Sequence, residues 1–94
     1  MDRAAVLALA HAAVMGRGKS YGSPERSFFE IARLWSVFFD REFTPGDVAL
    51  ALALMKLARL KADPSHNDSI IDLAGYAACL GEIQTFTQDD EEGA

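Results

Sequence analysis

The segment 47–60 (DVALALALMKLARL) is the strongest constraint on the fold, because eleven of its fourteen residues are apolar. The preceding Thr44-Pro45-Gly46-Asp47 is typical of a helix start, with a capping threonine, a proline for the first turn and an acidic residue three positions after the cap. A helix that is apolar nearly all round lies at the centre of a bundle or in a subunit interface. A chain of 94 residues has no centre large enough to cover every face of a helix. We therefore expect oligomerisation through this third helix.

Three further helices are expected around this segment. Residues 1–15 are rich in alanine and contain no glycine or proline, which favours a helix. A second helix should begin at Pro24 or Ser27 and end near Asp40, because its apolar residues recur at three- and four-residue spacing. Its core-facing stripe would consist of Phe28, Ile31, Trp35 and Phe38 or Phe39. Pro64 ends the third helix, and a fourth should run from a cap at Asn67 or Asp68 to about Phe86.

The remaining segments predict how these helices are joined. Residues 16–27 (GRGKSYGSPERS) contain three glycines and a proline, which predicts a loop. No segment alternates apolar and polar residues in the manner of a strand. The predicted fold is therefore all-α, a compact four-helix bundle formed by residues 1–87. Residues 88–94 contain the acidic run Asp89–Glu92, which predicts a disordered tail.

Charge and composition exclude several classes of function. Residues 16–61 carry a net charge of +3 and residues 62–94 carry −8, within a total of −5. The chain has no long basic stripe, so binding to duplex DNA is not expected. The longest apolar run, residues 48–55, is far shorter than the roughly 20 residues that span a bilayer. A single cysteine, Cys79, indicates a reducing compartment, and we expect a cytoplasmic protein, without a signal peptide at residues 1–15.

The third and fourth helices carry polar side chains at spacings that place them on one face. Lys56 and Arg59 are three residues apart, and Asp68, Asp72 and Tyr76 follow at intervals of four. Antiparallel packing across the short connection at 63–67 would bring the two groups together. One interpretation is a set of ion pairs that joins the helices. The other is a site where Lys56 and Arg59 hold phosphate oxygens, with Asp68 and Asp72 orienting them or binding Mg²⁺.

The glycine-rich segment is a second candidate for ligand binding. Arg17 and Lys19 supply cations, and Tyr21 supplies a ring that can stack on a base. The spacing of a Walker A loop is absent, and the alternative is a connector with solvated charges. His66 could act as an acid or base but fits an exposed turn residue better, and Cys79 fits a small buried residue. No motif of a zinc or serine hydrolase is present, and no catalytic residue is assigned.

Five blocks together resemble a family of short, uncharacterised helical proteins encoded by bacteriophages and prophages. The blocks lie at Arg17–Gly22, Phe28–Ser36, Thr44–Ala49, Lys56–Arg59 and Asp68–Ala77. A more distant resemblance is to the MazG-like all-helical nucleoside triphosphate pyrophosphatases. That resemblance implies that Asp68 and Asp72 match the acidic pair that holds Mg²⁺ on the later helix. The earlier helix has Lys56-Leu57-Ala58-Arg59 where the MazG-like group has a glutamate-rich motif, which favours direct phosphate binding over a metal cage.

Three functions are compatible with these features. The first is binding of a nucleotide or cyclic nucleotide through Arg17, Lys19, Lys56 and Arg59, with Tyr21 or Tyr76 on the base, in control of nucleotide pools or sequestration of a signalling nucleotide. The second is a Mg²⁺-dependent pyrophosphohydrolase that uses Asp68 and Asp72. The third is a protein-interaction module in which the third helix and the Trp35 stripe dock on a host or phage protein. We expect a homo-oligomer in the first case.

Overall fold

A computed structural model describes residues 1–21 and 24–93, with side chains for residues 1–16 and 26–85. It consists of four helices: α1 (Arg3–Tyr21), α2 (Pro24–Phe39), α3 (Pro45–Ala62) and α4 (Asn67–Gly93). No strand occurs in these described ranges, so the all-α, four-helix prediction is confirmed. Among the described residues, no helix combines the length and hydropathy that a bilayer crossing requires. Oligomerisation stays a prediction.

The start of α3 follows the predicted capping pattern. The backbone N–H of Asp47 donates to the Thr44 hydroxyl at 3.1 Å, and the Thr44 N–H donates to a carboxylate oxygen of Asp47 at 2.9 Å. Pro45 occupies the first turn, where its missing N–H costs nothing. This reciprocal capping box fixes where α3 begins, because two N–H groups that have no partner within the helix are both satisfied.

The helix α1 is longer than the sequence pattern predicts. Asp2 caps it by accepting the N–H of Ala5 at 2.8 Å, and the helix continues through Gly16 to Tyr21. Glycine costs about 1 kcal/mol relative to alanine in a helix, but it keeps the backbone donor that proline lacks. The next proline is Pro24, which begins α2. The predicted loop over residues 16–27 was therefore wrong for residues 16–21, whereas the start of α2 at Pro24 confirms the earlier of the two predicted starts.

The end of α2 is fixed by the backbone that follows it and by the side chain of Ser36. Asp40 follows the helix in the left-handed region, with φ of 53°, and the N–H of Arg41 donates back to the carbonyl of Ser36 at 3.2 Å. This arrangement closes the last turn of a helix. The Ser36 hydroxyl accepts the N–H of Phe43 at 2.9 Å and so holds the α2–α3 connection against α2.

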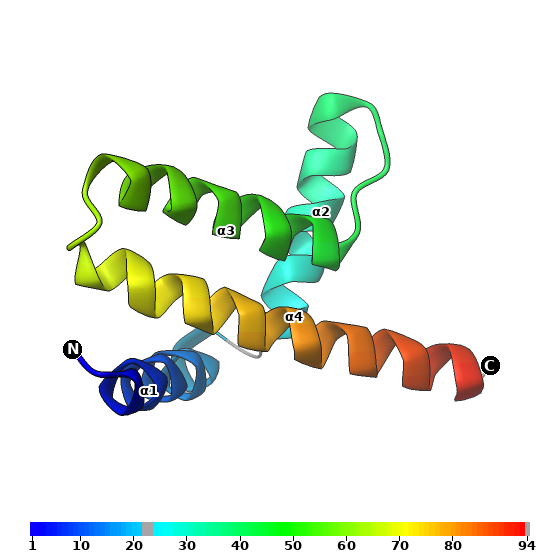
Figure 1. Cartoon of the computed structure of the whole chain (residues 1–94). Helices are drawn as coiled ribbons and strands as arrows, with labels where there is room; N and C mark the ends of the chain where they lie inside the picture. The colour runs from blue at the N-terminus through cyan, green and yellow to red at the C-terminus, as the bar shows by residue number, and fades with distance from the viewer. Residues whose placement is uncertain (22–23, 94) are drawn as a thin grey trace.

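The helices pack as one antiparallel pair crossed by the other two. Figure 1 shows α3 and α4 side by side in opposite directions, α2 crossing them steeply, and α1 below α4. The upper half of α2 extends beyond α3, and the end of α4 extends beyond the other helices. The helix α4 passes the expected end at Phe86 and reaches Gly93. The division of the chain into a domain and a tail stays a prediction.

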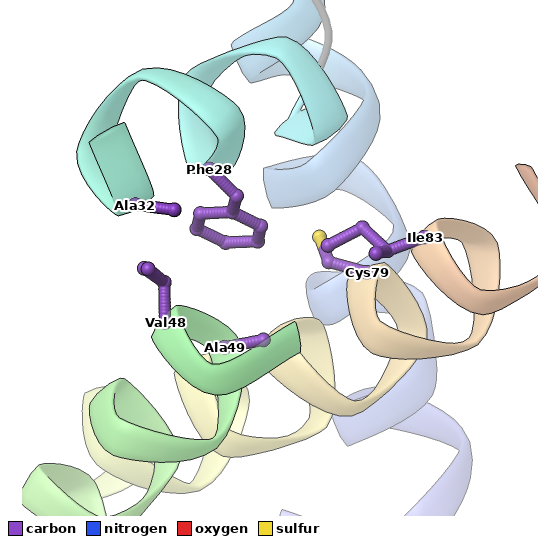
Figure 2. Packing of buried hydrophobic residues seen from close by; sticks show 6 residues of the cluster. All are labelled: Phe28, Ala32, Val48, Ala49, Cys79 and Ile83. Carbon is purple, nitrogen blue, oxygen red and sulfur yellow. The ribbon is translucent and has the colours of Figure 1, made fainter. Parts of the chain in front are cut away.

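The core is small and lies where α2, α3 and α4 meet (Figure 2). Its buried residues are Phe28, Ala32, Val48, Ala49, Cys79 and Ile83. Trp35 and Phe43 pack against this cluster with their rings edge to face, 5.8 Å between centroids. The burial of Cys79 and the core role of Phe28, Ile31 and Trp35 are confirmed.

The prediction that Phe38 or Phe39 continues the core stripe was wrong. Phe38 and Phe39 are exposed, and their rings contact each other at 4.9 Å. The periodicity of α2 is regular, but the helix extends beyond the elements that it packs against (Figure 1). An apolar side chain at the right helical angle remains in solvent when no neighbouring helix reaches it.

Candidate functional site

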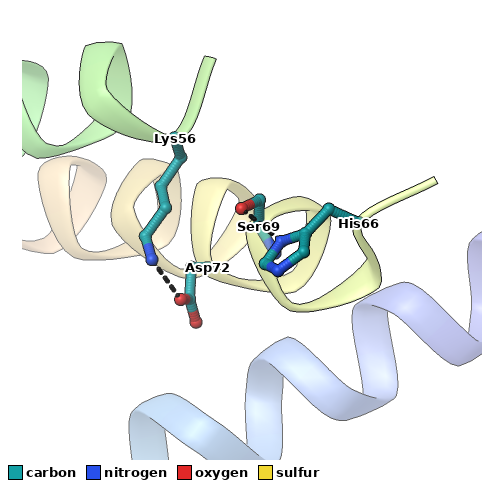
Figure 3. A network of polar contacts seen from close by, with 4 residues as sticks. All are labelled: Lys56, His66, Ser69 and Asp72. Atoms are coloured by element: carbon teal, nitrogen blue, oxygen red, sulfur yellow. Dashed lines mark hydrogen bonds and ion pairs between the residues drawn. The ribbon is translucent and has the colours of Figure 1, made fainter. Parts of the chain in front are cut away.

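Lys56 and Asp72 form the ion pair that the sequence predicts between α3 and α4. The Lys56 ammonium lies 2.9 Å from a carboxylate oxygen of Asp72 (Figure 3). The Lys56 side chain is 12% exposed and the Asp72 side chain is 40% exposed. The pair therefore joins two neighbouring helices at the edge of their interface, where Lys56 covers apolar surface with its aliphatic stem. This geometry matches the interpretation in which ion pairs join the helices.

The other predicted site residues on these helices do not complete a shared cluster. Arg59 and Asp68 are exposed, and no ion pair connects them within the described side chains. The ring of Tyr76 is half-buried and lies 6.4 Å from that of Phe28. Asp68, Asp72 and Tyr76 do share one side of α4, because helical residues four apart are neighbours. Of the predicted cations, Lys56 alone is paired with this side of α4 in the described structure.

The remaining candidate residues lie outside the described side chains. Arg17, Lys19 and Tyr21 belong to the last part of α1, and their role in ligand binding stays a prediction. The described residues contain no group of three or more His, Cys, Asp or Glu side chains placed to hold a metal ion. Mg²⁺ binding by Asp68 and Asp72 likewise stays a prediction.

His66 has a structural role that sequence reasoning missed. Its carbonyl accepts the N–H groups of Ser69 and Ile70 at 3.1 and 3.3 Å. Its Nδ1 lies 2.7 Å from the Ser69 hydroxyl and accepts the Ser69 N–H at 3.3 Å (Figure 3). His66 therefore caps α4, so the prediction of a cap at Asn67 or Asp68 was wrong by one or two residues. No sequence signal identified this cap, because every residue other than proline offers the N–H group that a cap accepts at that position.

The connection before His66 is a short hydrogen-bonded turn. Asp63 accepts the Ser65 hydroxyl at 2.6 Å and the Ser65 N–H at 3.1 Å. These two hydrogen bonds, the one from the hydroxyl first, hold the pKa of Asp63 below its ordinary value. Asp63 thus stabilises the turn. Both hydrogen bonds of its carboxylate come from Ser65, and neither involves the Lys56–Asp72 pair.

Among the described side chains, many large apolar ones on α2 and α3 are exposed. Seven large side chains on α2 and α3 are between 48% and 82% exposed, and we refer to them as the α2–α3 apolar surface: Leu34, Val37, Phe38, Phe39, Leu50, Leu54 and Leu57. Phe38 and Phe39 alone present roughly 200–350 Å² at these exposures, given 150–250 Å² for an aromatic side chain. The leucines and the valine add to this exposed apolar area, and exposed apolar area of a few hundred Å² in one patch is typical of interaction sites.

Fold and site together define a small all-α domain with a structural ion pair and a large exposed apolar surface. Comparison with known proteins identifies its family: the chain belongs to the family described as Domain of unknown function (DUF6378), whose model matches residues 5–84. The predicted resemblance to short phage-encoded proteins of unknown function is thereby confirmed, because its curated relatives are phage proteins.

The two relatives reported are each described as Gene 55 protein. The one from Mycobacterium phage D29 is 45% identical over 67 residues, and the one from Mycobacterium phage L5 is 39% identical over 69 residues. The matches cover 71% and 72% of this chain but 44% of each relative, so the chain spans less than half of their length. No solved structure matches. The similarity to MazG-like enzymes stays a prediction.

Proposed function

We propose that this chain is a protein-interaction domain of a phage protein, and that the α2–α3 apolar surface binds a partner with an apolar helical face. The observation that carries the proposal is the exposure of this surface. Leaving seven large apolar side chains in water costs free energy that binding recovers, at about 25 cal/mol per Å² of apolar area covered. Such a surface on a folded domain is typical of an interaction site.

The spacing of the apolar residues on α3 supports a helical partner. Leu50, Leu54 and Leu57 lie on the side of α3 opposite the core residues Val48 and Ala49. Their intervals of four and three residues are those through which two helices pack side by side. A partner helix laid along α3 would contact all three leucines at once.

The proposal is tested with a photo-reactive residue in the full chain. Leu54 and Leu7 are both 66% exposed, but Leu7 lies on α1, away from the α2–α3 apolar surface. Benzoylphenylalanine would replace either leucine in chains expressed in mycobacterial cells, which are the hosts of the two phage relatives. Irradiation should yield a discrete protein adduct from position 54 and much less from position 7. Equal yields from the two positions, or none from position 54, would rule out an interaction function for this surface.

A second candidate is nucleotide binding, with control of nucleotide pools or sequestration of a signalling nucleotide. It is supported by the pairing of Lys56 with Asp72 beside Asp68 and Tyr76 on α4, since these groups combine a cation, carboxylates and a ring. A panel of nucleotides and cyclic dinucleotides would be tested by thermal shift. A ligand at 100 times its dissociation constant stabilises the folded state by about 2.7 kcal/mol. No shift across the panel would exclude this candidate.

Two variants separate binding from hydrolysis. A binding protein should keep its thermal shift in chelator and lose it in Arg59→Ala. A Mg²⁺-dependent pyrophosphohydrolase should require the metal and lose pyrophosphate release in Asp72→Asn, because Asp68 and Asp72 would hold the ion. The interaction domain proposed first should retain its adduct from position 54 in both variants.

A further inference from the structure

The exposed side of α3 carries opposite charges at its two ends. Asp47, Leu50, Leu54, Leu57 and Lys61 follow one another at intervals of three, four, three and four residues, and all five are exposed. Positions with this spacing form one stripe along a helix. The stripe therefore begins with a carboxylate, ends with an ammonium group, and has three leucines between them. Lys56 interrupts the apolar residues of α3 on another side, because it is turned toward Asp72.

We propose that the partner of this surface is a second copy of the chain, with the two α3 helices packed antiparallel about a two-fold axis near Leu54. The inference rests on the interaction function proposed above. The antiparallel arrangement places Leu54 against its own equivalent and Leu50 against Leu57 of the second copy. It also places Asp47 opposite Lys61 at both ends, as a two-fold axis requires every contact to occur twice. A parallel arrangement would instead place Asp47 beside Asp47 and Lys61 beside Lys61, where like charges repel.

The surface area of the single chain supports an interface of this size. The chain exposes 6830 Å², whereas a folded monomer of this mass exposes about 5,300 Å². Its radius of gyration is 14.3 Å, against about 12 Å for a globular domain of this length. The excess of about 1,500 Å² is larger than the roughly 800 Å² that each partner buries in a standard interface. The end of α4, which extends beyond the other helices (Figure 1), and the exposed apolar side chains of α1, α2 and α3 all contribute to it.

The half of α2 that extends beyond α3 would enlarge the same interface. Ser36 holds the α2–α3 connection on one side of α2, and Leu34 and Phe38, each two residues from Ser36, lie about 160° around the helix from it. Figure 1 shows the connection on the side of α2 away from the length of α3. Leu34 and Phe38 thus lie on the side of α2 away from the connection. An antiparallel α3 placed there would bring its C-terminal half against these two side chains.

The oligomeric state of the full chain tests the proposal. Sedimentation of the unmodified chain should give twice the 10.2 kDa of one copy. Leu54→Glu should raise the dissociation constant of the dimer roughly 100-fold or more, since two carboxylates would meet in an apolar contact. Leu7→Glu, equally exposed on α1, should leave it unchanged. A monomer at all concentrations, or a dimer that Leu54→Glu does not weaken, would overturn the proposal.

Disulfide formation tests the direction of the two helices without weakening the interface. An equal mixture of Leu50→Cys and Leu57→Cys chains should oxidise to a mixed dimer, while Leu50→Cys alone should form far less. The native Cys79 is buried and so gives a low background. Efficient formation of disulfide-linked dimers by Leu50→Cys alone would indicate parallel helices and contradict the antiparallel packing of the two α3 helices.

The two proposals fail in different ways. If the chain is monomeric but position 54 still yields an adduct with another protein, the second-copy inference is wrong and the interaction function stands. If the adduct contains two copies of this chain, both are supported. If the chain is monomeric and position 54 yields no adduct, both are wrong.

Discussion

Ser36 connects two segments through a single hydroxyl group. It donates to the carbonyl of Ala32 at 2.7 Å within α2 and accepts the N–H of Phe43 at 2.9 Å from the connection to α3. Phe43 in turn packs its ring against Trp35. The position of Phe43 beside the core therefore depends on a hydrogen bond from α2, as well as on the hydrophobicity of its ring.

Replacement of this hydroxyl should destabilise the fold. Ser36→Ala leaves the N–H of the half-buried Phe43 without its acceptor, so we expect a loss of about 1–2 kcal/mol in the free energy of unfolding. Urea unfolding followed by circular dichroism measures it. Thr85→Ala is a suitable control, because the Thr85 hydroxyl also donates to a carbonyl four residues earlier but is exposed. Equal effects of the two variants would show that the bond to Phe43 contributes nothing.

Among the elements, α4 has an unusual residue, His66, as its N-terminal cap. The Ser69 side chain is fully buried, and its hydroxyl and N–H both contact Nδ1 of His66. Asn67 and Asp68 are better caps by preference, but His66 precedes them and its ring reaches the third helical position. The start of α3 was predictable because Thr44 is an ordinary cap and Asp47, in the place of the more usual Glu or Gln, carries the same carboxylate group. The cap of α4 was not, because histidine is rare there.

Removal of the His66 ring should therefore weaken α4. His66→Ala loses the cap and leaves the buried Ser69 hydroxyl without a partner, for an expected loss of about 2 kcal/mol. His66→Asn supplies an oxygen that can accept the Ser69 N–H and should recover about half of the loss. Thermal unfolding of the two variants against the unmodified chain measures both effects. A destabilisation by His66→Asn as large as that by His66→Ala would contradict the capping role.

The Lys56–Asp72 pair gives a prediction about the contact between α3 and α4. Asp72→Ala leaves the ammonium of Lys56, which is 12% exposed, without its partner, so we expect a loss of about 1–2 kcal/mol after allowance for partial solvent exposure.

Lys56→Met is the matched variant for this contact. It keeps the aliphatic length and removes the charge, so it should change stability by less than about 1 kcal/mol. Urea unfolding of both variants tests this difference. If Lys56→Met were as destabilising as Asp72→Ala, the pair itself would stabilise the fold by more than the packing of the lysine stem does.

At the scale of the whole molecule, the small core and the large exposed surface have the same cause. Only α3 and α4 lie side by side, and because α1 and α2 cross them, the upper half of α2 and the end of α4 extend beyond the contact region (Figure 1). The molecule is therefore elongated and measures 43 × 28 × 24 Å along its principal axes. A domain of 94 residues has modest stability of its own, and burial of the α2–α3 apolar surface would add to it.

The second-copy inference therefore predicts that stability depends on protein concentration. For a dimer whose unfolding releases monomers, each tenfold rise in concentration adds about 1.4 kcal/mol per mole of dimer. The thermal midpoint of the unmodified chain should rise by several degrees over two decades of concentration. The midpoint of Leu54→Glu should stay constant. A midpoint of the unmodified chain that is independent of concentration would argue against the dimer.

The sequence alone determined the number and order of the helices, the capping box of α3 and the burial of Cys79, because these depend on neighbouring residues and on composition. The tertiary structure decided which residues share a surface. The exposure of Phe38 and Phe39 depends on how far α2 extends beyond α3, and the pairing of Asp72 with Lys56 depends on the contact between α3 and α4. Periodicity gives the angle of a side chain around its own helix. The position and length of the neighbouring helix decide whether that side chain is covered.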